Sequence, residues 1–426
     1  MKLVVGKSDL RGAVDIPGSK SHTIRAAVIA TLATGESRIE QPLESADGRS
    51  ALEACRALGA PIVEESGVWR VTGLAGAPQV PDNIVDVQNS GTTMRLVMGA
   101  ASLLKDGVAV LTGDEQVRRR PCGPLAQALT ALGARVVSTR GNGCPPVVVE
   151  GRLRGGETSI EAVTSQYVSS LLISTPLASG DTVLHVPLLN EKPYVGITLD
   201  WVRRQGVRIE HDEDYTEFRI PGGQSYQPVR GRIPGDFSSA TFFLAGGALS
   251  GNAVMCRGLD MTDTQGDKAV VDYLVQMGAD VSVEPDGVRV SAKGLRGCEI
   301  DMNATPDALP MMAVLACFAE GETRLVNVPQ ARLKETDRIA VMRAELSKLG
   351  AEIRELPDGL VIGGRPLHAG EVEGHGDHRV VMALAIGAGQ VAGETVIHGS
   401  EAMAVTYPGF TEALIALGGL AREENE

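Results

Sequence analysis

The segment Lys348-Leu349-Gly350-Ala351 ends an amphipathic helix with a glycine, and the same ending returns along the whole chain. A glycine just after a helix is typical of a helix C-terminus, because glycine adopts the left-handed backbone conformation without steric cost. Successive endings are 74, 73, 72, 72 and 68 residues apart, and a short strand-like segment follows each. The glycines of this first marker are Gly59, Gly133, Gly206, Gly278, Gly350 and Gly418. The 426 residues therefore form six copies of one unit.

A second glycine marker keeps the same interval, with spacings of 72, 73, 71, 70 and 72 residues. Each of its glycines ends an Ala-rich helix and opens an apolar strand. They are Gly35, Gly107, Gly180, Gly251, Gly321 and Gly393. One unit is thus predicted to contain strand, helix, strand, helix and strand, with one further strand, which indicates an α/β fold.

The composition indicates how these elements pack. Hydrophobic residues make up 43% of the chain and aromatic residues only 3%, while glycine occurs 51 times. Small side chains let helices approach closely, so we expect the helices inside and the sheets outside. The first copy starts a strand early, so the segment Met1 to Ile16 is expected to complete the C-terminal half. This gives one domain of residues 1–17 plus 233–426 and another of residues 18–232, with a Pro/Gly-rich double hinge near 16–20 and 227–235.

Charge and cysteine usage exclude several classes of protein. A net charge of −13 argues against a nucleic-acid surface, which needs a basic face. The six cysteines show neither a CxxC pair nor a Cys/His ligand spacing, so neither a zinc site nor a disulfide framework is expected. The N-terminus lacks an apolar segment long enough for a signal peptide or a membrane span. We therefore expect a cytoplasmic protein with no membrane partner and no metal.

Polar side chains gather at the start of the first helix of each unit. Ser, Thr, Asn and Asp are ordinary N-cap residues, and this structural role accounts for about half of them. The cations Lys20, Arg25, Arg95 and Arg379 need another explanation, because the helix dipole disfavours positive charge at a helix N-terminus. A solvated charge could explain any single one. Four in the same register favour a cleft that binds phosphate or carboxylate.

Two loops that leave a strand at corresponding places add further charge. Arg118-Arg119-Arg120 follows the strand of the second copy, and the segment from Arg332 to Arg338 follows that of the fifth, with Thr336 a candidate cap for the next helix. Asp307 and Glu335 belong to the same copy and could lie close together. Surrounding cations would keep Asp307 ionised as a base, and a less solvated Glu335 could remain a protonated acid. Structural carboxylates in salt bridges remain the alternative.

These residues resemble the 5-enolpyruvylshikimate-3-phosphate synthase family over the whole chain. The matching segments include Pro17-Gly18-Ser19-Lys20-Ser21 with Arg25, Ser90 to Arg95, Arg120-Pro121, Ser165-Gln166, Lys192-Pro193-Tyr194, Pro306-Asp307-Ala308, Lys334 to Arg338 and Asp377-His378-Arg379. The resemblance implies an inside-out α/β barrel of two domains, each with three βαβαββ repeats. It also implies transfer of the enolpyruvyl group of phosphoenolpyruvate to the 5-hydroxyl of shikimate 3-phosphate without a cofactor. We expect a monomer, with glyphosate as an inhibitor.

The resemblance also assigns roles to residues. Asp307 and Glu335 would be catalytic, with Lys20 assisting. Shikimate 3-phosphate would be held by Lys20, Ser21, Arg25, Thr164, Ser165, Gln166, Tyr194, Asp307, Gln330 and Lys334. Phosphoenolpyruvate would be held by Lys20, Gly91, Arg120, Gln166, Glu335, Arg338, His378 and Arg379.

The chain departs from the family pattern at four positions. Val405 replaces a Lys that is usual in the family, and Gln330 replaces an Asn. Glu191 replaces the Ser that precedes Lys-Pro-Tyr, and Leu96 replaces the Pro that often follows Met-Arg. We expect these changes to shift substrate affinity and inhibitor sensitivity without abolishing the chemistry.

Two alternatives remain. The UDP-N-acetylglucosamine enolpyruvyl transferase family is similar in fold and chemistry, but its loop ahead of Arg-Pro carries a cysteine, and here residues 113–120 have none. A catalytically silent paralogue that keeps the anion site is the other, and the presence of Asp307, Glu335, Lys20 and Arg379 argues against it.

Overall fold

The computed structural model describes residues 1–425 and divides them into two compact units. The continuous unit spans Lys20–Ile233, and the discontinuous unit combines Met1–Ser19 with Pro234–Glu426. Each unit has its own hydrophobic core. Among the described residues, no helix is both long and apolar enough to cross a membrane.

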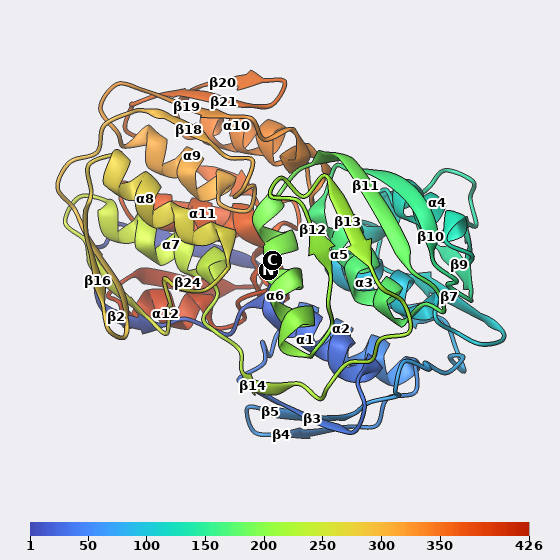
Figure 1. The fold of residues 1–426 in the computed structure, drawn as a ribbon. Helices are drawn as coiled ribbons and strands as arrows, with labels where there is room; N and C mark the ends of the chain where they lie inside the picture. Colours follow the sequence, from blue (N-terminus) through green and yellow to red (C-terminus); the bar gives the residue numbers. More distant parts are fainter. Residues whose placement is uncertain (426) are drawn as a thin grey trace. The chain divides into compact units, whose positions relative to one another are not determined.

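The continuous unit has three central helices and three outer helices, enclosed by three four-stranded sheets (Figure 1). The central helices are α1 (Lys20–Leu32), α3 (Gly91–Ala101) and α5 (Ser165–Ser174), and the outer ones are α2 (Ala46–Ala57), α4 (Gly123–Ala131) and α6 (Lys192–Arg204). The strands of each sheet are given in spatial order. The first sheet is β14 (Arg230–Arg232), β3 (Glu36–Glu40), β5 (Val68–Thr72) and β4 (Ile62–Glu65), and the second is β6 (Val85–Asp86), β7 (Val108–Thr112), β9 (Val147–Glu150) and β8 (Arg135–Ser138). The third sheet is β10 (Gly156–Ala162), β11 (Thr182–Leu189), β13 (Glu217–Ile220) and β12 (Glu210–His211).

The discontinuous unit repeats this plan. Its central helices are α7 (Phe237–Ala248), α9 (Leu309–Cys317) and α11 (His378–Ala388), and its outer helices are α8 (Ala269–Gln276), α10 (Arg338–Lys348) and α12 (Phe410–Ala416). Its first sheet, in spatial order, is β16 (Asp280–Glu284), β17 (Gly287–Ser291), β15 (Ala253–Arg257) and β2 (Arg11–Asp15). The second is β18 (Glu299–Asp301), β19 (Glu322–Val326), β21 (Gly359–Gly363) and β20 (Glu352–Leu356), and the third is β22 (Glu371–Glu373), β23 (Glu394–His398), β1 (Lys2–Gly6) and β24 (Leu420–Glu424). Short 3-10 turns are η1 (Val117–Arg119), η2 (Thr175–Leu177), η3 (Gly266–Lys268), η4 (Pro329–Leu333) and η5 (Ser400–Val405).

Each sheet follows one pattern, which confirms the predicted repeat. One parallel pair joins the strand after each central helix to a strand beside it, and the remaining pairs are antiparallel. In four sheets the parallel partner is the strand just before the same helix, whereas β3 and β15 take β14 and β2 instead. Three sheets take one strand from a distant part of the chain: β14 pairs with β3, β2 with β15, and β1 inserts between β23 and β24. Every copy is therefore a complete βαβαββ unit in space.

The two kinds of helix differ in burial as the composition predicts. Nearly every residue of a central helix is buried, from α1 with its Ala-rich sequence to α7, in which all twelve are buried. The outer helices keep one polar, exposed face, as in α2. Within each unit, the helices thus lie inside and the sheets lie outside (Figure 1).

The first glycine marker ends each outer helix in the left-handed region. All six glycines have φ between 82° and 107°. A side chain there is strained, because its Cβ approaches the following carbonyl oxygen. The repeat visible in the sequence is therefore a repeated backbone conformation.

We expect Gly278→Ala to lower the free energy of unfolding by about 1–2 kcal/mol, because a residue with a Cβ is disfavoured at positive φ. Gly278 has φ of 97°, and a Cβ there would lie 3.1 Å from the carbonyl oxygen of Gly294. Gly409→Ala is the matched control, since Gly409 has φ of −91° and open space around its Cβ position. Chemical denaturation of both variants checks this, and equal stability of the two would contradict it.

Candidate active site

A buried arginine organises the polar groups of the discontinuous unit. Arg338, the first residue of α10, is completely buried. Its Nε donates to Asp377 Oδ2 at 2.8 Å, its Nη1 to Asp307 Oδ1 at 2.7 Å and its Nη2 to Glu335 Oε2 at 2.8 Å. Burial lowers the pKa of Arg338, but the carboxylates of Asp377, Glu335 and Asp307 outweigh burial and hold that pKa well above its ordinary value. Arg338 is therefore a permanent cation shared by three carboxylates.

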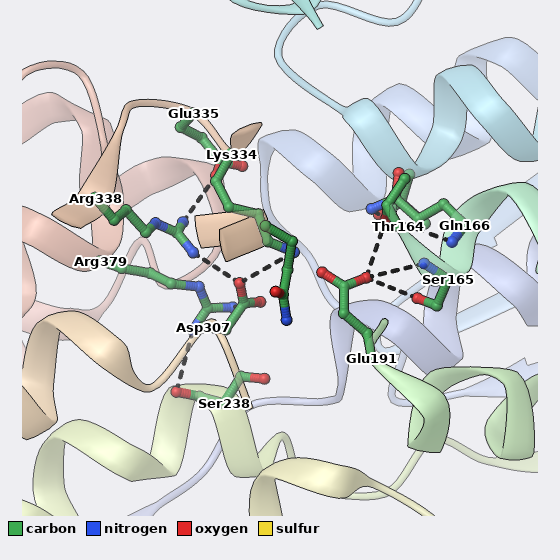
Figure 2. Close-up of polar contacts among 12 residues, drawn as sticks. Thr164, Ser165, Gln166, Glu191, Ser238, Asp307, Lys334, Glu335, Arg338 and Arg379 are labelled. Atoms are coloured by element: carbon green, nitrogen blue, oxygen red, sulfur yellow. Dashed lines mark hydrogen bonds and ion pairs between the residues drawn. The ribbon is translucent and has the colours of Figure 1, made fainter. Parts of the chain in front are cut away.

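A second arginine joins the starts of the central helices of this unit. Arg379 Nη2 lies 2.9 Å from Asp307 Oδ2, and Nη1 donates to the carbonyl oxygen of Ser238 at 3.3 Å (Figure 2). Ser238 is near the start of α7, Asp307 precedes α9, and Arg379 is in the first turn of α11. Lys334 Nζ is 3.9 Å from Asp307 Oδ1. Three cations around one carboxylate favour its ionised form.

Glu335 and Asp307, the two predicted acid/base residues, lie at the same guanidinium group. They bind adjacent nitrogens of Arg338, and their side chains are 10% and 15% exposed. The predicted proximity of the two carboxylates is present in the structure. Both carboxylates also form salt bridges with Arg338, which agrees with the alternative that they are structural ion-paired groups.

Asp377 connects this group to α11. It is the N-cap residue of α11, and its Oδ1 accepts the backbone N–H of Arg379 at 2.9 Å. Burial raises the pKa of Asp377, but Arg338 outweighs this and the pKa lies below the ordinary value. The prediction that Thr336 caps α10 was wrong: Asp337 is the N-cap and accepts from Ala340 N, because its carboxylate reaches the third N–H of the helix, while Thr336 donates to Asp377.

Gln330 and His378 are less directly connected to this group. Gln330 lies in η4, is buried, and donates from Nε2 to the carbonyl oxygen of Asn303 at 2.9 Å. His378 is the first residue of α11 and is completely buried.

In the continuous unit, two guanidinium groups converge on Gly91. A Cβ at Gly91 would lie 2.5 Å from Nη1 of both Arg95 and Arg120. Arg95 Nη1 donates to the carbonyl oxygen of Gly91 and its Nη2 to that of Pro121. Gly91 is also the first residue of α3, where backbone N–H groups lack helical partners. Only glycine leaves room for both cations at this helix start.

The start of α5 holds an internal carboxylate. Glu191 Oε2 accepts from Ser165 N at 3.1 Å, Ser165 Oγ at 2.8 Å and Thr164 Oγ1 at 3.0 Å (Figure 2). Gln166 Nε2 donates to Thr92 Oγ1 at 3.1 Å, which links the starts of α5 and α3. The donors of Thr164 and Ser165, which were predicted to bind a substrate anion, therefore bind the carboxylate of Glu191.

Lys20 and Arg25 lie at the start of α1, and both contact protein groups. Lys20 Nζ is 3.2 Å from Asp47 Oδ2. The Arg25 guanidinium donates to Ser169, Thr198 and the carbonyl oxygens of Ser21 and Tyr194. Burial lowers the pKa of Arg25 to about 10, with Tyr194 and Glu191 opposing, so it remains charged at neutral pH. Arg25 thus ties α1 to α5 and α6.

Sequence reasoning gave no role to Asp47 or Ser238, and it quoted Asp377 only as part of a motif. Asp377 carried a recognisable signal, since Asp before a helix start is a common N-cap. The other two carried none. Asp47 is an ordinary acidic residue in the first turn of α2, and Ser238 contributes only its carbonyl oxygen.

Comparisons with known proteins agree on one family. Residues 4–414 match the family described as EPSP synthase (3-phosphoshikimate 1-carboxyvinyltransferase). Proteins named 3-phosphoshikimate 1-carboxyvinyltransferase from Ruminiclostridium cellulolyticum and Acetivibrio thermocellus are 53% and 55% identical, over 98% of this chain and 99% and 98% of theirs. A solved EPSP synthase from Acinetobacter baumannii superposes with a TM-score of 0.84 at 28% identity, covering 99% of this chain and all of that one.

We expect Arg338→Leu to lower the free energy of unfolding by about 3–5 kcal/mol, because it leaves buried carboxylates without their cation. Chemical denaturation at pH 7 measures this. Arg422→Leu is the control: its exposed ion pairs with Glu394 and Glu424 should contribute little.

The pH dependence of this loss follows from Asp377. Arg338 holds the folded-state pKa of Asp377 below its unfolded value, so its stabilisation is complete above about pH 4 and is lost as the pH falls through the folded pKa. Arg338→Leu removes the largest influence that lowers the pKa of Asp377, so that burial and the neighbouring Glu335 then favour the protonated acid. The stability deficit of the variant should therefore shrink as the pH is lowered from 7 to 4, and a constant deficit would contradict this account.

Proposed function

Because the chain belongs to the EPSP synthase (3-phosphoshikimate 1-carboxyvinyltransferase) family, we propose that the groups around Arg338 and Gly91 are parts of its active site. The enzyme transfers the enolpyruvyl group of phosphoenolpyruvate to the 5-hydroxyl of shikimate 3-phosphate and releases phosphate. The names of the relatives give no support to UDP-N-acetylglucosamine as the acceptor. The observation that carries the site proposal is Asp307, a carboxylate that is 15% exposed and set among Lys334, Arg338 and Arg379.

The two substrates are both multiply charged anions, so cations must offset their repulsion before they can react. We assign the binding of phosphoenolpyruvate to Lys20, Gly91, Arg120, Gln166, Glu335, Arg338, His378 and Arg379. Binding of shikimate 3-phosphate is assigned to Lys20, Ser21, Arg25, Thr164, Ser165, Gln166, Tyr194, Asp307, Gln330 and Lys334. Support comes from the burial of the arginines and from the N–H groups at the starts of α3 and α5, which suit anions.

The chemistry needs one base and one acid. Asp307 takes the proton of the 5-hydroxyl as its oxygen attacks C2 of phosphoenolpyruvate, and Glu335 gives a proton to C3, with Lys20 assisting. The resulting tetrahedral intermediate expels phosphate as C3 returns a proton to Glu335, and the proton held by Asp307 passes to the departing phosphate or to water. In this scheme Glu335 must be protonated when both substrates are bound.

Arg338 suits this exchange because it contacts both carboxylates. As Asp307 gains a proton, Glu335 loses one, so the number of negative charges facing the guanidinium stays the same. The electrostatic environment therefore needs little rearrangement during the proton transfers, which is the condition for effective electrostatic catalysis.

Release of inorganic phosphate from shikimate 3-phosphate plus phosphoenolpyruvate tests the proposed roles. We expect Asp307→Asn and Glu335→Gln each to lower kcat by about 10²–10⁴-fold, the usual contribution of a positioned acid or base. Glu299→Gln is the control, because Glu299 is an exposed carboxylate on β18 of the same repeat, paired with Arg324. Turnover retained by either active-site variant would remove that residue from its role.

Gly91→Ala tests the anion site of the continuous unit. A methyl group would displace the guanidinium groups of Arg95 and Arg120, so we expect KM for phosphoenolpyruvate to rise by about 10-fold or more. The KM for shikimate 3-phosphate should change far less. Steady-state kinetics with each substrate varied in turn measures both, and an unchanged KM for phosphoenolpyruvate would place its binding elsewhere.

We also infer that the enzyme acts in the cytoplasm as a monomer on free small molecules, with glyphosate as an inhibitor. Free cysteines, including the buried Cys55, Cys122, Cys256 and Cys317, suit a reducing compartment. The net charge of −13 disfavours binding to nucleic acid or to anionic membranes.

A further inference from the structure

We propose that Glu191 sets the affinity of the enzyme for the phosphate of shikimate 3-phosphate, by occupying the phosphate's place at the start of α5 in the free enzyme. This inference rests on the function and the site residues proposed above. It makes Glu191 a specificity-determining residue for the acceptor substrate.

The contacts of Glu191 are those expected of a bound phosphate oxygen. One carboxylate oxygen accepts a backbone N–H and two hydroxyl groups, all from Thr164 and Ser165. The backbone N–H opens α5, a helix of ten residues with no acidic residue in its first turn. The positive end of the helix dipole therefore receives its negative charge from Glu191.

Burial and backbone conformation show that this is a defined position. Glu191 is 2% exposed, and its φ of 58° places it in the left-handed region, which is unusual for a residue with a long side chain. The next residue, Lys192, is directed elsewhere, with its Nζ 3.1 Å from Asp214 and over the ring of Tyr215. Arg25, another predicted ligand of shikimate 3-phosphate, is close enough for Glu191 to raise its pKa.

A carboxylate and a phosphate cannot share these donors. Both are anions, and their repulsion at contact distance adds to the loss of the hydrogen bonds. Substrate must therefore displace the side chain of Glu191 from Thr164 and Ser165 before its phosphate can bind. Shikimate has no phosphate, so it can bind without displacing Glu191.

The test compares two ligands on four proteins by isothermal titration calorimetry. We expect Glu191→Gln, which keeps the shape and removes the charge, to bind shikimate 3-phosphate about 10-fold or more tightly than the unchanged enzyme. The affinity for shikimate should change by less than about 2-fold, because the penalty concerns the phosphate alone. Glu191→Ser, which removes the competing side chain, should tighten binding of shikimate 3-phosphate further.

Glu157→Gln is the matched control, because Glu157 is an exposed carboxylate on β10 of the same unit and contacts His185, away from α5. Its affinities should equal those of the unchanged enzyme. Thermal unfolding of all variants shows whether each is folded. Unchanged or weaker binding of shikimate 3-phosphate by both folded Glu191 variants would overturn the inference, and so would equal tightening of both ligands. Failure of the proposed function is a separate result, namely no phosphate release by the unchanged enzyme.

Discussion

A helix that is buried on every side can present polar backbone groups only at its two ends, and this constraint underlies the rest of the structure. Six central helices are in this position, three in each unit. Their first N–H groups need acceptors, which are side chains, neighbouring carbonyl groups or a bound anion. Affinity for anions is thus a consequence of how the core is packed.

The two units meet this constraint with different chemistry. In the discontinuous unit, carboxylates occupy the helix starts, and Arg338 and Arg379 neutralise them. In the continuous unit, hydroxyl groups and guanidinium groups predominate around Gly91 and Thr164, and Glu191 is the exception. The first kind of environment suits the proposed proton transfers, and the second suits the proposed binding of a phosphorylated substrate. One repeat has therefore given rise to both by substitution at the same few positions.

The sequence predicted what depends on local backbone conformation. The six glycines after the outer helices announce the repeat because each needs a left-handed φ, and the starts of the central helices follow from their cap residues. The sequence alone did not predict the contacts between different copies of the repeat. Periodicity places Asp307, Glu335 and Asp377 at helix starts or strand exits, yet it does not show that all three share the guanidinium of Arg338. Glu191 was visible only as a departure from a family pattern, because its partners at Thr164 and Ser165 are 26 residues or more away. The capping of α10 was misassigned for a local reason: two adjacent residues, Thr336 and Asp337, both suit an N-cap.

The strands exchanged along the chain determine when each unit can fold during synthesis. The continuous unit is complete once β14 has left the ribosome, because β14 adds the last strand of its sheets. The strands β1 and β2 are made long before their partners, because β2 pairs with β15 and β1 pairs with β24. Until β23 and β24 have been made, the nascent protein therefore carries a finished unit together with an unpaired apolar segment, Leu3 to Val5, and exposed segments of this kind favour aggregation during synthesis.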